Sequence, residues 1–251
     1  MHVQQHPLSA TLPVIKRSAI PLSGYVYQNL VGLRLLCDWL DDPGLYDWVQ
    51  FEADHDEFPK GLDDIVAQRR DGTLVLLQVK FTVNAQDASN ALTWDWLLTR
   101  KPRGRSLLQK WCDGLFDIAP ERVHTAALFT NRVPSREFEA TIDASLLRVK
   151  LESVDAAVFT KILEQLGGED RAKAFFERFE FRHSYQGAEA LERTVVDRFI
   201  PRHGDRTGWL ALFREAIDWA VRVNCPPPHG RITLDFLRGT IDVRRPRPLE
   251  Q

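Results

Sequence analysis

The fold is decided by one stretch of the sequence, residues 63–81, which reads DDIVAQRRDGTLVLLQVKF. Two apolar segments, 65–68 and 73–81, flank the dipeptide Asp71-Gly72, and this arrangement predicts a β-hairpin. The run Leu74–Leu77 is apolar on both faces, as is typical of a central strand that is covered on both sides. The stretch therefore predicts two paired strands, the second of them inside a sheet.

Two polar residues end this otherwise apolar strand. Gln78 and Lys80 are two positions apart, so in a strand they project from the same face. Burying them there is costly without partners, and antiparallel pairing brings Asp63 and Asp64 alongside them. A carboxylate, an amide oxygen and an ammonium group at one edge of a sheet form a workable cation site with an adjacent positive donor.

The length of the turn decides which aspartate takes part. If only Asp71-Gly72 forms the loop, Asp63 pairs with Lys80 and shares its face. A three-residue loop shifts the register by one position and places Asp64 on that face instead. The sequence leaves both alternatives open.

The segments around the hairpin predict an α/β protein with a C-terminal helical region. A helix is expected to begin with Ser23 as N-cap and to end at Asp41, before Pro43-Gly44. Further strands are expected at 48–52, 123–130 and 147–150, and a helical stretch at 90–116 with an interruption near 102–104. The remaining expected helices are 154–166, 169–178, 186–200, 206–223 and 232–239. We expect a flexible leader (1–21), a core (22–150), a helical accessory region (151–243) and a linker or frayed terminus (244–251).

Composition limits the kind of protein this chain can be. It has 251 residues, is 44% hydrophobic and carries 33 basic against 35 acidic residues. These values exclude a disordered tail, a fibrous protein and a coiled coil, and any contact with nucleic acid must come from a local basic patch. The cysteines Cys37, Cys112 and Cys225 are too far apart for a CxxC pair, which argues against a disulfide framework and a structural zinc site. Without a long apolar segment or a signal sequence, we expect a cytoplasmic protein with no membrane partner.

A basic run follows the hairpin. Residues 100–110 contain no acidic residue, and Gly104 gives the backbone room for close approach to a ligand. We expect a phosphate-contacting patch, although a solvated loop between helices would have the same composition. Its members are Arg100, Lys101, Arg103, Arg105 and Lys110. The nearby Trp94, Trp96 and Trp111 are expected to be core residues rather than platforms for base stacking.

Four short motifs between residues 22 and 131 occur in an order that resembles a known family. They are Gly24-Tyr25-x-Tyr27-Gln28, Asp63-Asp64-Ile65, Gln78-Val79-Lys80 and Phe129-Thr130-Asn131. The pattern Asp-(x)n-Gln-x-Lys across the hairpin, preceded by a helix and a strand, resembles the PD-(D/E)XK nuclease superfamily, with Gln in place of the usual acid. More narrowly, the four motifs together resemble the double-strand-DNA endonuclease domain of bacterial antiphage effectors, which is found in CBASS effectors and at the N-terminus of antiviral STAND NTPases.

The resemblance implies a restriction-endonuclease-like core that cleaves double-stranded DNA with Mg²⁺, or with Mn²⁺ in its place. It implies that Asp64 binds the metal, that Gln78 takes the position of a second ligand and that Lys80 activates water and stabilises charge. Glu52 would add a second carboxylate as a metal ligand, and Gln28 would reach the site from the first helix.

The resemblance also implies a fused or partner sensor, either a STAND NTPase or a cyclic-nucleotide-sensing domain, and a homo-oligomer is expected. The alternatives are a catalytically silent DNA- or protein-binding module and an RNA-cleaving nuclease.

Overall fold

A computed structural model describes residues 20–53 and 58–242 of the chain. The expected leader therefore lies outside the described residues except for its last two positions, which already belong to the first helix. The expected linker at 244–251 also lies outside them.

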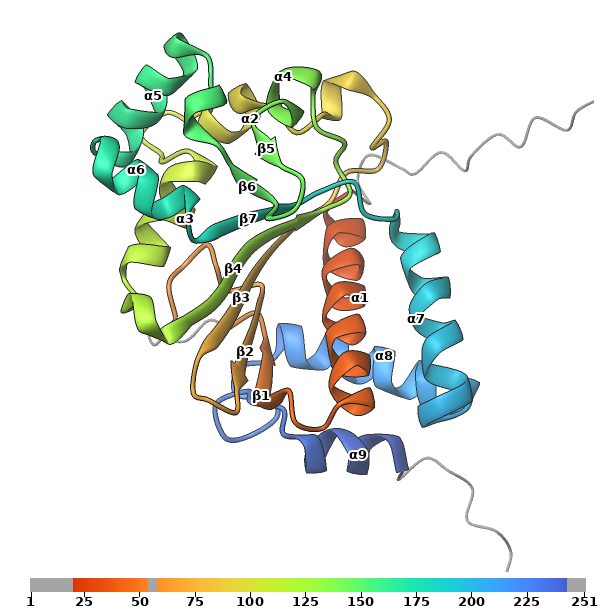
Figure 1. The fold of residues 1–251 in the computed structure, drawn as a ribbon. Coiled ribbons are helices and arrows are strands. Elements are labelled where there is room, and N and C mark those ends of the chain that lie inside the picture. Colours follow the sequence, from red (N-terminus) through yellow and green to blue (C-terminus); the bar gives the residue numbers. More distant parts are fainter. Residues whose placement is uncertain (1–19, 54–57, 243–251) are drawn as a thin grey trace, which may run out of the picture.

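A mixed five-stranded sheet forms the centre of the molecule (Figure 1). Its first three strands are antiparallel to one another, whereas the last two run parallel to the third. The protein is thus α/β with a mixed sheet flanked by helices and a C-terminal helical region, as the sequence predicts. In spatial order the strands are β1 (Tyr46–Phe51), β2 (Ile65–Arg69), β3 (Leu74–Lys80), β4 (Val123–Thr130) and β7 (Phe179–Arg182).

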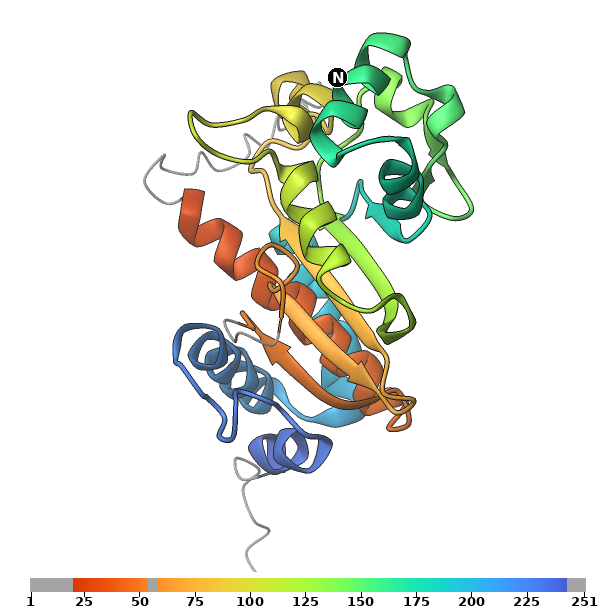
Figure 2. The ribbon, with the colours of Figure 1, turned by 90° about the vertical axis from the view of Figure 1, so that its left-hand side faces the viewer.

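Helices cover both faces of the sheet and create two separate cores (Figures 1 and 2). On one face lie α1 (Ile20–Asp41), α7 (Ala188–His203), α8 (Arg206–Val221) and α9 (Leu234–Asp242). On the other face lie α2 (Trp94–Leu98), α3 (Leu107–Phe116), α5 (Ala156–Leu166) and α6 (Glu169–Phe176). The smaller elements are the short helix α4 (Arg136–Glu139), a separate two-stranded sheet of β5 (Ile142–Asp143) and β6 (Arg148–Val149), and 3₁₀ turns at Ala88–Asn90, Pro120–Arg122 and Leu151–Ser153.

The predicted hairpin is confirmed, and its loop has three residues. Arg69 closes the strand pair by donating its amide to the carbonyl of Thr73 (2.8 Å), which leaves Arg70, Asp71 and Gly72 in the loop. Gly72 has a φ of 82°, the left-handed conformation in which a three-residue hairpin loop commonly ends. The run Leu74–Leu77 is buried throughout, as expected of a central strand.

Several predicted boundaries need correction. The first helix begins at Ile20 rather than after Ser23, because Pro21 is tolerated in a first helical turn. The helical stretch expected at 90–116 begins at Trp94, and its expected interruption near 102–104 is longer, since the eight residues between α2 and α3 have no helical assignment. The strand expected at 147–150 is only Arg148–Val149, and it pairs with β5 outside the central sheet.

The fifth strand of the central sheet is not predicted from the sequence. Phe179, Glu180, Phe181 and Arg182 form β7, in which buried and half-buried residues alternate. This strand lies within the region expected to be a helical accessory and pairs with β4. The period-two alternation was visible in the sequence, but four residues between two helical patterns are a weak signal.

Candidate functional site

Glu52, Asp64 and Gln78 form a row of polar residues across β1, β2 and β3, near the end of β3. Register places Asp64 opposite Gln78, since Ile65 pairs with Leu77, and the amide of Glu52 donates to the carbonyl of Asp64 (2.9 Å). The three-residue loop of the hairpin sets this register and so places Asp64 on the same face of the sheet as Gln78 and Lys80.

The carboxylate of Asp64 is the centre of the row. Its Oδ2 accepts hydrogen bonds from the Gln78 side-chain amide and from the Val79 backbone amide (2.7 Å), and it forms an ion pair with Lys80 Nζ (3.6 Å). Asp63 instead accepts a hydrogen bond from the backbone of Gly61 (2.9 Å), so its carboxylate stabilises the loop before β2. The structure therefore brings Asp64, Gln78 and Lys80 together and gives Asp63 a different contact.

Burial dominates the ionisation of this carboxylate. Asp64 is only 9% exposed, and burial raises its pKa, while the Lys80 ammonium and the Val79 amide act in the opposite direction. A cation bound beside Asp64 would lower the pKa of this carboxyl, as Lys80 does. The group is thus placed where bound positive charge has a large effect on its protonation.

Gln28 joins the row from another element and contacts Glu52. The side-chain nitrogen of Gln28, on α1, donates to Glu52 Oε1 (2.7 Å) and to the backbone carbonyl of Asp64 (3.2 Å). Glu52 directly follows β1 with a φ of 44°, a conformation that residues other than glycine seldom adopt. Burial raises the pKa of its carboxyl to about 7; the hydrogen bond from Gln28 lowers that pKa and the charge of Asp64 raises it further.

One supporting residue received no individual role from the sequence. Asn131 donates its side-chain amide to the carbonyl of Thr82 (2.7 Å) and accepts a hydrogen bond from the amide of Thr82 (2.9 Å). Thr82 lies two residues after Lys80, so this pair of bonds fixes the chain just beyond the site. The motif Phe129-Thr130-Asn131 was noticed in the sequence, but a contact across two strands is only visible after folding.

The basic run is exposed, and its members have different surroundings. Arg105 forms an ion pair with Asp113 (2.7 Å). Lys110 lies on α3 against the loop that leads into β2, since a Cβ atom added at Gly61 would lie 3.5 Å from Lys110 Cβ. The remaining three, Arg100, Lys101 and Arg103, lie in the connection between α2 and α3, which projects as a loop in Figure 2.

The tryptophans near this run pack in or against the core. Trp94 and Trp111 are buried, as expected of core aromatics. Trp96 is half-buried against the same core, and the guanidinium of Arg132 lies 4.6 Å from its ring centroid. Cys37 is likewise fully buried, as expected of a small core residue.

The donor set of the row consists of oxygen atoms, which hard cations such as Mg²⁺ prefer. Among the described residues, no group of three or more His, Cys, Asp and Glu side chains is arranged to hold a metal. Magnesium needs only one or two protein carboxylates, because water and substrate phosphates complete its octahedron. Asp64 and Glu52 supply two carboxylates, and Gln78, whose nitrogen donates to Asp64, keeps its amide oxygen for a cation.

Neither a scan of protein-family models nor a search of curated proteins finds a match to this chain. Within residues 20–53 and 58–242, no helix has the length and apolar character needed to cross a membrane.

Proposed function

We propose that the protein is a Mg²⁺-dependent endonuclease with a restriction-endonuclease-like core, acting on double-stranded DNA with little sequence preference. The observation that carries the proposal is the convergence of Asp64, Gln78 and Lys80 from the two strands of one hairpin. Glu52 and Gln28 extend this cluster from β1 and α1. Phosphodiester hydrolysis requires oxygen ligands for a hard cation and positive charge close to the phosphate, and these residues provide both.

The contacts of each residue support a role for it in this proposal. Asp64 and Glu52 would hold the cation, with the amide oxygen of Gln78 as a further ligand. When bound, Mg²⁺ supplies Lewis-acid activation of water and of the phosphate. Lys80, one third exposed and tethered to Asp64, donates to the developing negative charge on the phosphate oxygens. Gln28 fixes the orientation of Glu52, and Lys110 provides a phosphate contact beside the loop before β2.

Plasmid cleavage tests the proposal directly. Lys80→Ala should lower the rate of Mg²⁺-dependent cleavage by about 100-fold or more, because one positioned donor of this kind typically contributes that much. Lys161→Ala, which removes an exposed lysine from α5, serves as the matched control and should cleave like the wild type. Equal rates for wild type and Lys80→Ala would reject the assignment, and the same assay with labelled RNA separates DNA from RNA cleavage.

A second candidate is a catalytically silent module that binds DNA or protein on the same scaffold. It is favoured by one observation: Gln78, a neutral amide, lies beside Asp64 at a position where a second acid would strengthen metal binding. Salt-sensitive DNA binding without cleavage in Mg²⁺, Mn²⁺ and Ca²⁺ would support this candidate. Gln78→Glu provides the discriminating variant, since a silent site should gain cleavage when the acid is supplied.

The biological setting belongs to the same proposal and rests on the resemblance alone. An antiphage effector of this kind would be a homo-oligomer controlled by a fused or partner sensor, because unregulated cleavage would damage the host. Light scattering of the purified protein with and without DNA tests the assembly. A protein that stays monomeric in both states would contradict the oligomer.

A further inference from the structure

A second polar site lies between α1 and α7. A hollow of about 380 Å³ opens there, on the face of the sheet that α1 covers. That face carries Val79, whereas Gln78 and Lys80 project from the opposite one, because neighbouring residues of a strand alternate. The lining residues are Arg34, Cys37, Ser184, Tyr185, Gln186, Thr194, Val195 and Arg198.

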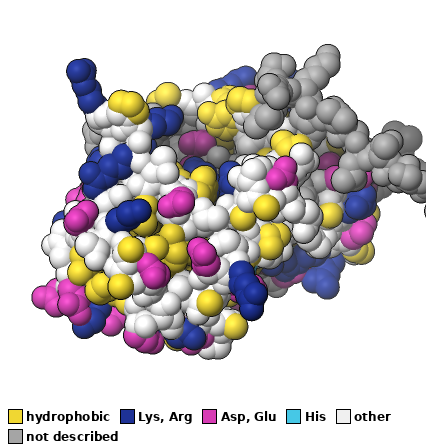
Figure 3. All heavy atoms as spheres, turned by 90° about the horizontal axis from the view of Figure 1, so that it is seen from above, with side chains coloured by type: hydrophobic (Ala, Val, Ile, Leu, Met, Phe, Trp, Pro, Cys, Tyr) yellow, Lys and Arg dark blue, Asp and Glu magenta, His cyan; other side chains and the backbone are white. Residues whose placement is uncertain are grey.

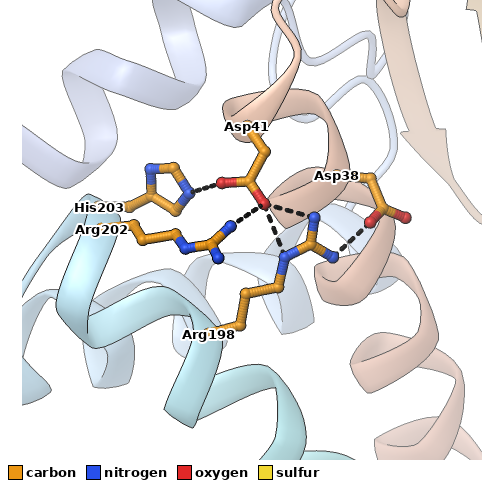
Figure 4. Close-up of polar contacts among 5 residues, drawn as sticks. All are labelled: Asp38, Asp41, Arg198, Arg202 and His203. Atoms are coloured by element: carbon orange, nitrogen blue, oxygen red, sulfur yellow. Dashed lines mark hydrogen bonds and ion pairs between the residues drawn. The ribbon is translucent and has the colours of Figure 1, made fainter.

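Arg34 is the uncompensated charge of this hollow. Within the described part of the chain its guanidinium makes no ion pair or hydrogen bond. It lies over the ring of Tyr185, 5.5 Å from the ring centroid. The acids nearby already have partners: Asp38 binds Arg198, and Asp41 binds Arg198, Arg202 and His203 (Figure 4). A half-buried cation without a counterion favours an anionic ligand.

A buried hydroxyl beside Arg34 also lacks a partner. Tyr27 is fully buried, and its hydroxyl makes no hydrogen bond with the described residues. Burial raises the pKa of Tyr27, Tyr185 raises it further and Arg34 lowers it, so these three side chains lie close enough to interact electrostatically. Arg34 and Tyr185 line the hollow, and beside them Tyr27 holds a hydroxyl without a partner, a donor suited to a phosphate oxygen.

A second hollow adjoins the first. It measures about 790 Å³ and shares the wall formed by Ser184, Tyr185 and Gln186. Its other polar lining residues include Asn84. Both volumes fall in the range of about 300–1,000 Å³ that is usual for sites of small molecules.

We propose that α1 and α7 hold a small phosphate ester about the size of a nucleoside monophosphate. Its phosphate would lie against Arg34, and the remainder would extend along Tyr185 into the second hollow. A small ligand fits better than a DNA duplex, because the two hollows have the volumes of small-molecule sites. This assignment is independent of the proposed nuclease activity.

Titration calorimetry of the whole protein with inorganic phosphate and with adenosine monophosphate tests the site. We expect both to bind, the monophosphate more tightly, and Arg34→Met to lower its affinity by about tenfold, which is the loss of one charge-assisted contact. Arg214→Met removes an exposed arginine from α8 without a described ion pair and should leave binding unchanged. Arg34→Lys, which keeps the charge but loses the planar fork, should also weaken binding.

Five outcomes would overturn the proposal. One is the absence of binding of both ligands up to about 10 mM, the range of the weakest useful contacts. Unchanged affinity of a folded Arg34→Met would also refute it, as would unchanged affinity of Arg34→Lys if the methionine variant does not fold. Phosphate binding without any gain from the nucleoside would remove the second hollow from the site. Binding of a duplex oligonucleotide that Arg34→Met weakens would replace the small ligand with nucleic acid.

Discussion

Glu52 lies at the point where β1 stops, and its carboxyl is close to the charges of Asp64 and Lys80. Its pKa of about 7 results mainly from burial, so the group changes its protonation near neutral pH. If Glu52 holds the cation with Asp64, metal binding must displace a proton below this pH. Cleavage should therefore require more Mg²⁺ at pH 6 than at pH 8.

The same ionisation predicts how stability depends on pH. Between the ordinary value of 4.5 and the folded value of about 7, the folded protein keeps a proton on Glu52 that the unfolded chain has lost. This contribution is complete below pH 4.5 and is lost as pH rises through the folded pKa. Relative to Glu52→Gln, the free energy of unfolding of the wild type should fall by about 1–2 kcal/mol from pH 5 to pH 8, allowing for partial exposure.

Urea denaturation in the presence of a chelator measures this difference without interference from metal. Glu164→Gln, which neutralises an exposed acid on α5, is the matched control and should follow the wild type at both pH values. A constant difference between wild type and Glu52→Gln would show that the Glu52 pKa is not raised by folding.

At the scale of the element, α1 connects the site to the core. It carries Gln28 to Glu52, and it approaches β1 so closely that only glycine fits at position 32. A Cβ atom there would lie 2.1 Å from Phe51 Cε1. Since Phe51 directly precedes Glu52, the packing of α1 on β1 also positions the carboxylate.

Gly32→Ala should therefore destabilise the protein by about 1–3 kcal/mol, because overpacking forces the helix or the ring to move. Gly24→Ala in the same helix is the matched control, since nothing lies within 4 Å of an added Cβ there. It should be neutral or stabilise by about 0.5–1 kcal/mol through helix propensity. Urea denaturation compares the two, and similar effects of both substitutions would contradict the close approach.

At the scale of the whole molecule, no single sign of charge dominates. Acidic and basic side chains alternate over the face shown in Figure 3, in keeping with the net charge of −2. The two helices α1 and α7 are joined instead by a local network in which Asp41 accepts hydrogen bonds from Arg198, Arg202 and His203 (Figure 4). The hydrogen bond from Arg198 is the main cause that lowers the pKa of Asp41.

Asp41→Asn should lower the free energy of unfolding by about 1 kcal/mol at pH 7 and low salt, and by less at high salt, as for other exposed networks. Because the folded pKa is depressed, the contribution is present above the ordinary value of 3.8 and is lost as pH falls through the folded one. Thermal unfolding at two salt concentrations measures the effect. Asp197→Asn on α7 is the control, and an equal loss there would mean that the network adds nothing specific.

The sequence by itself determined the features that depend on neighbouring residues. The hairpin, the strand 123–130 and most helices follow from hydrophobic period and turn residues, and Gln78 and Lys80 share a face for the same reason. The strand Phe179–Arg182 escaped because four residues carry too little periodicity.

Only the tertiary structure decided what depends on distant contacts. The three-residue loop selected Asp64 over Asp63, and the packing of α1 joined Gln28 to Glu52. Local patterns specify period and turn, whereas register across strands and the meeting of side chains from separate elements are set by how the whole chain packs.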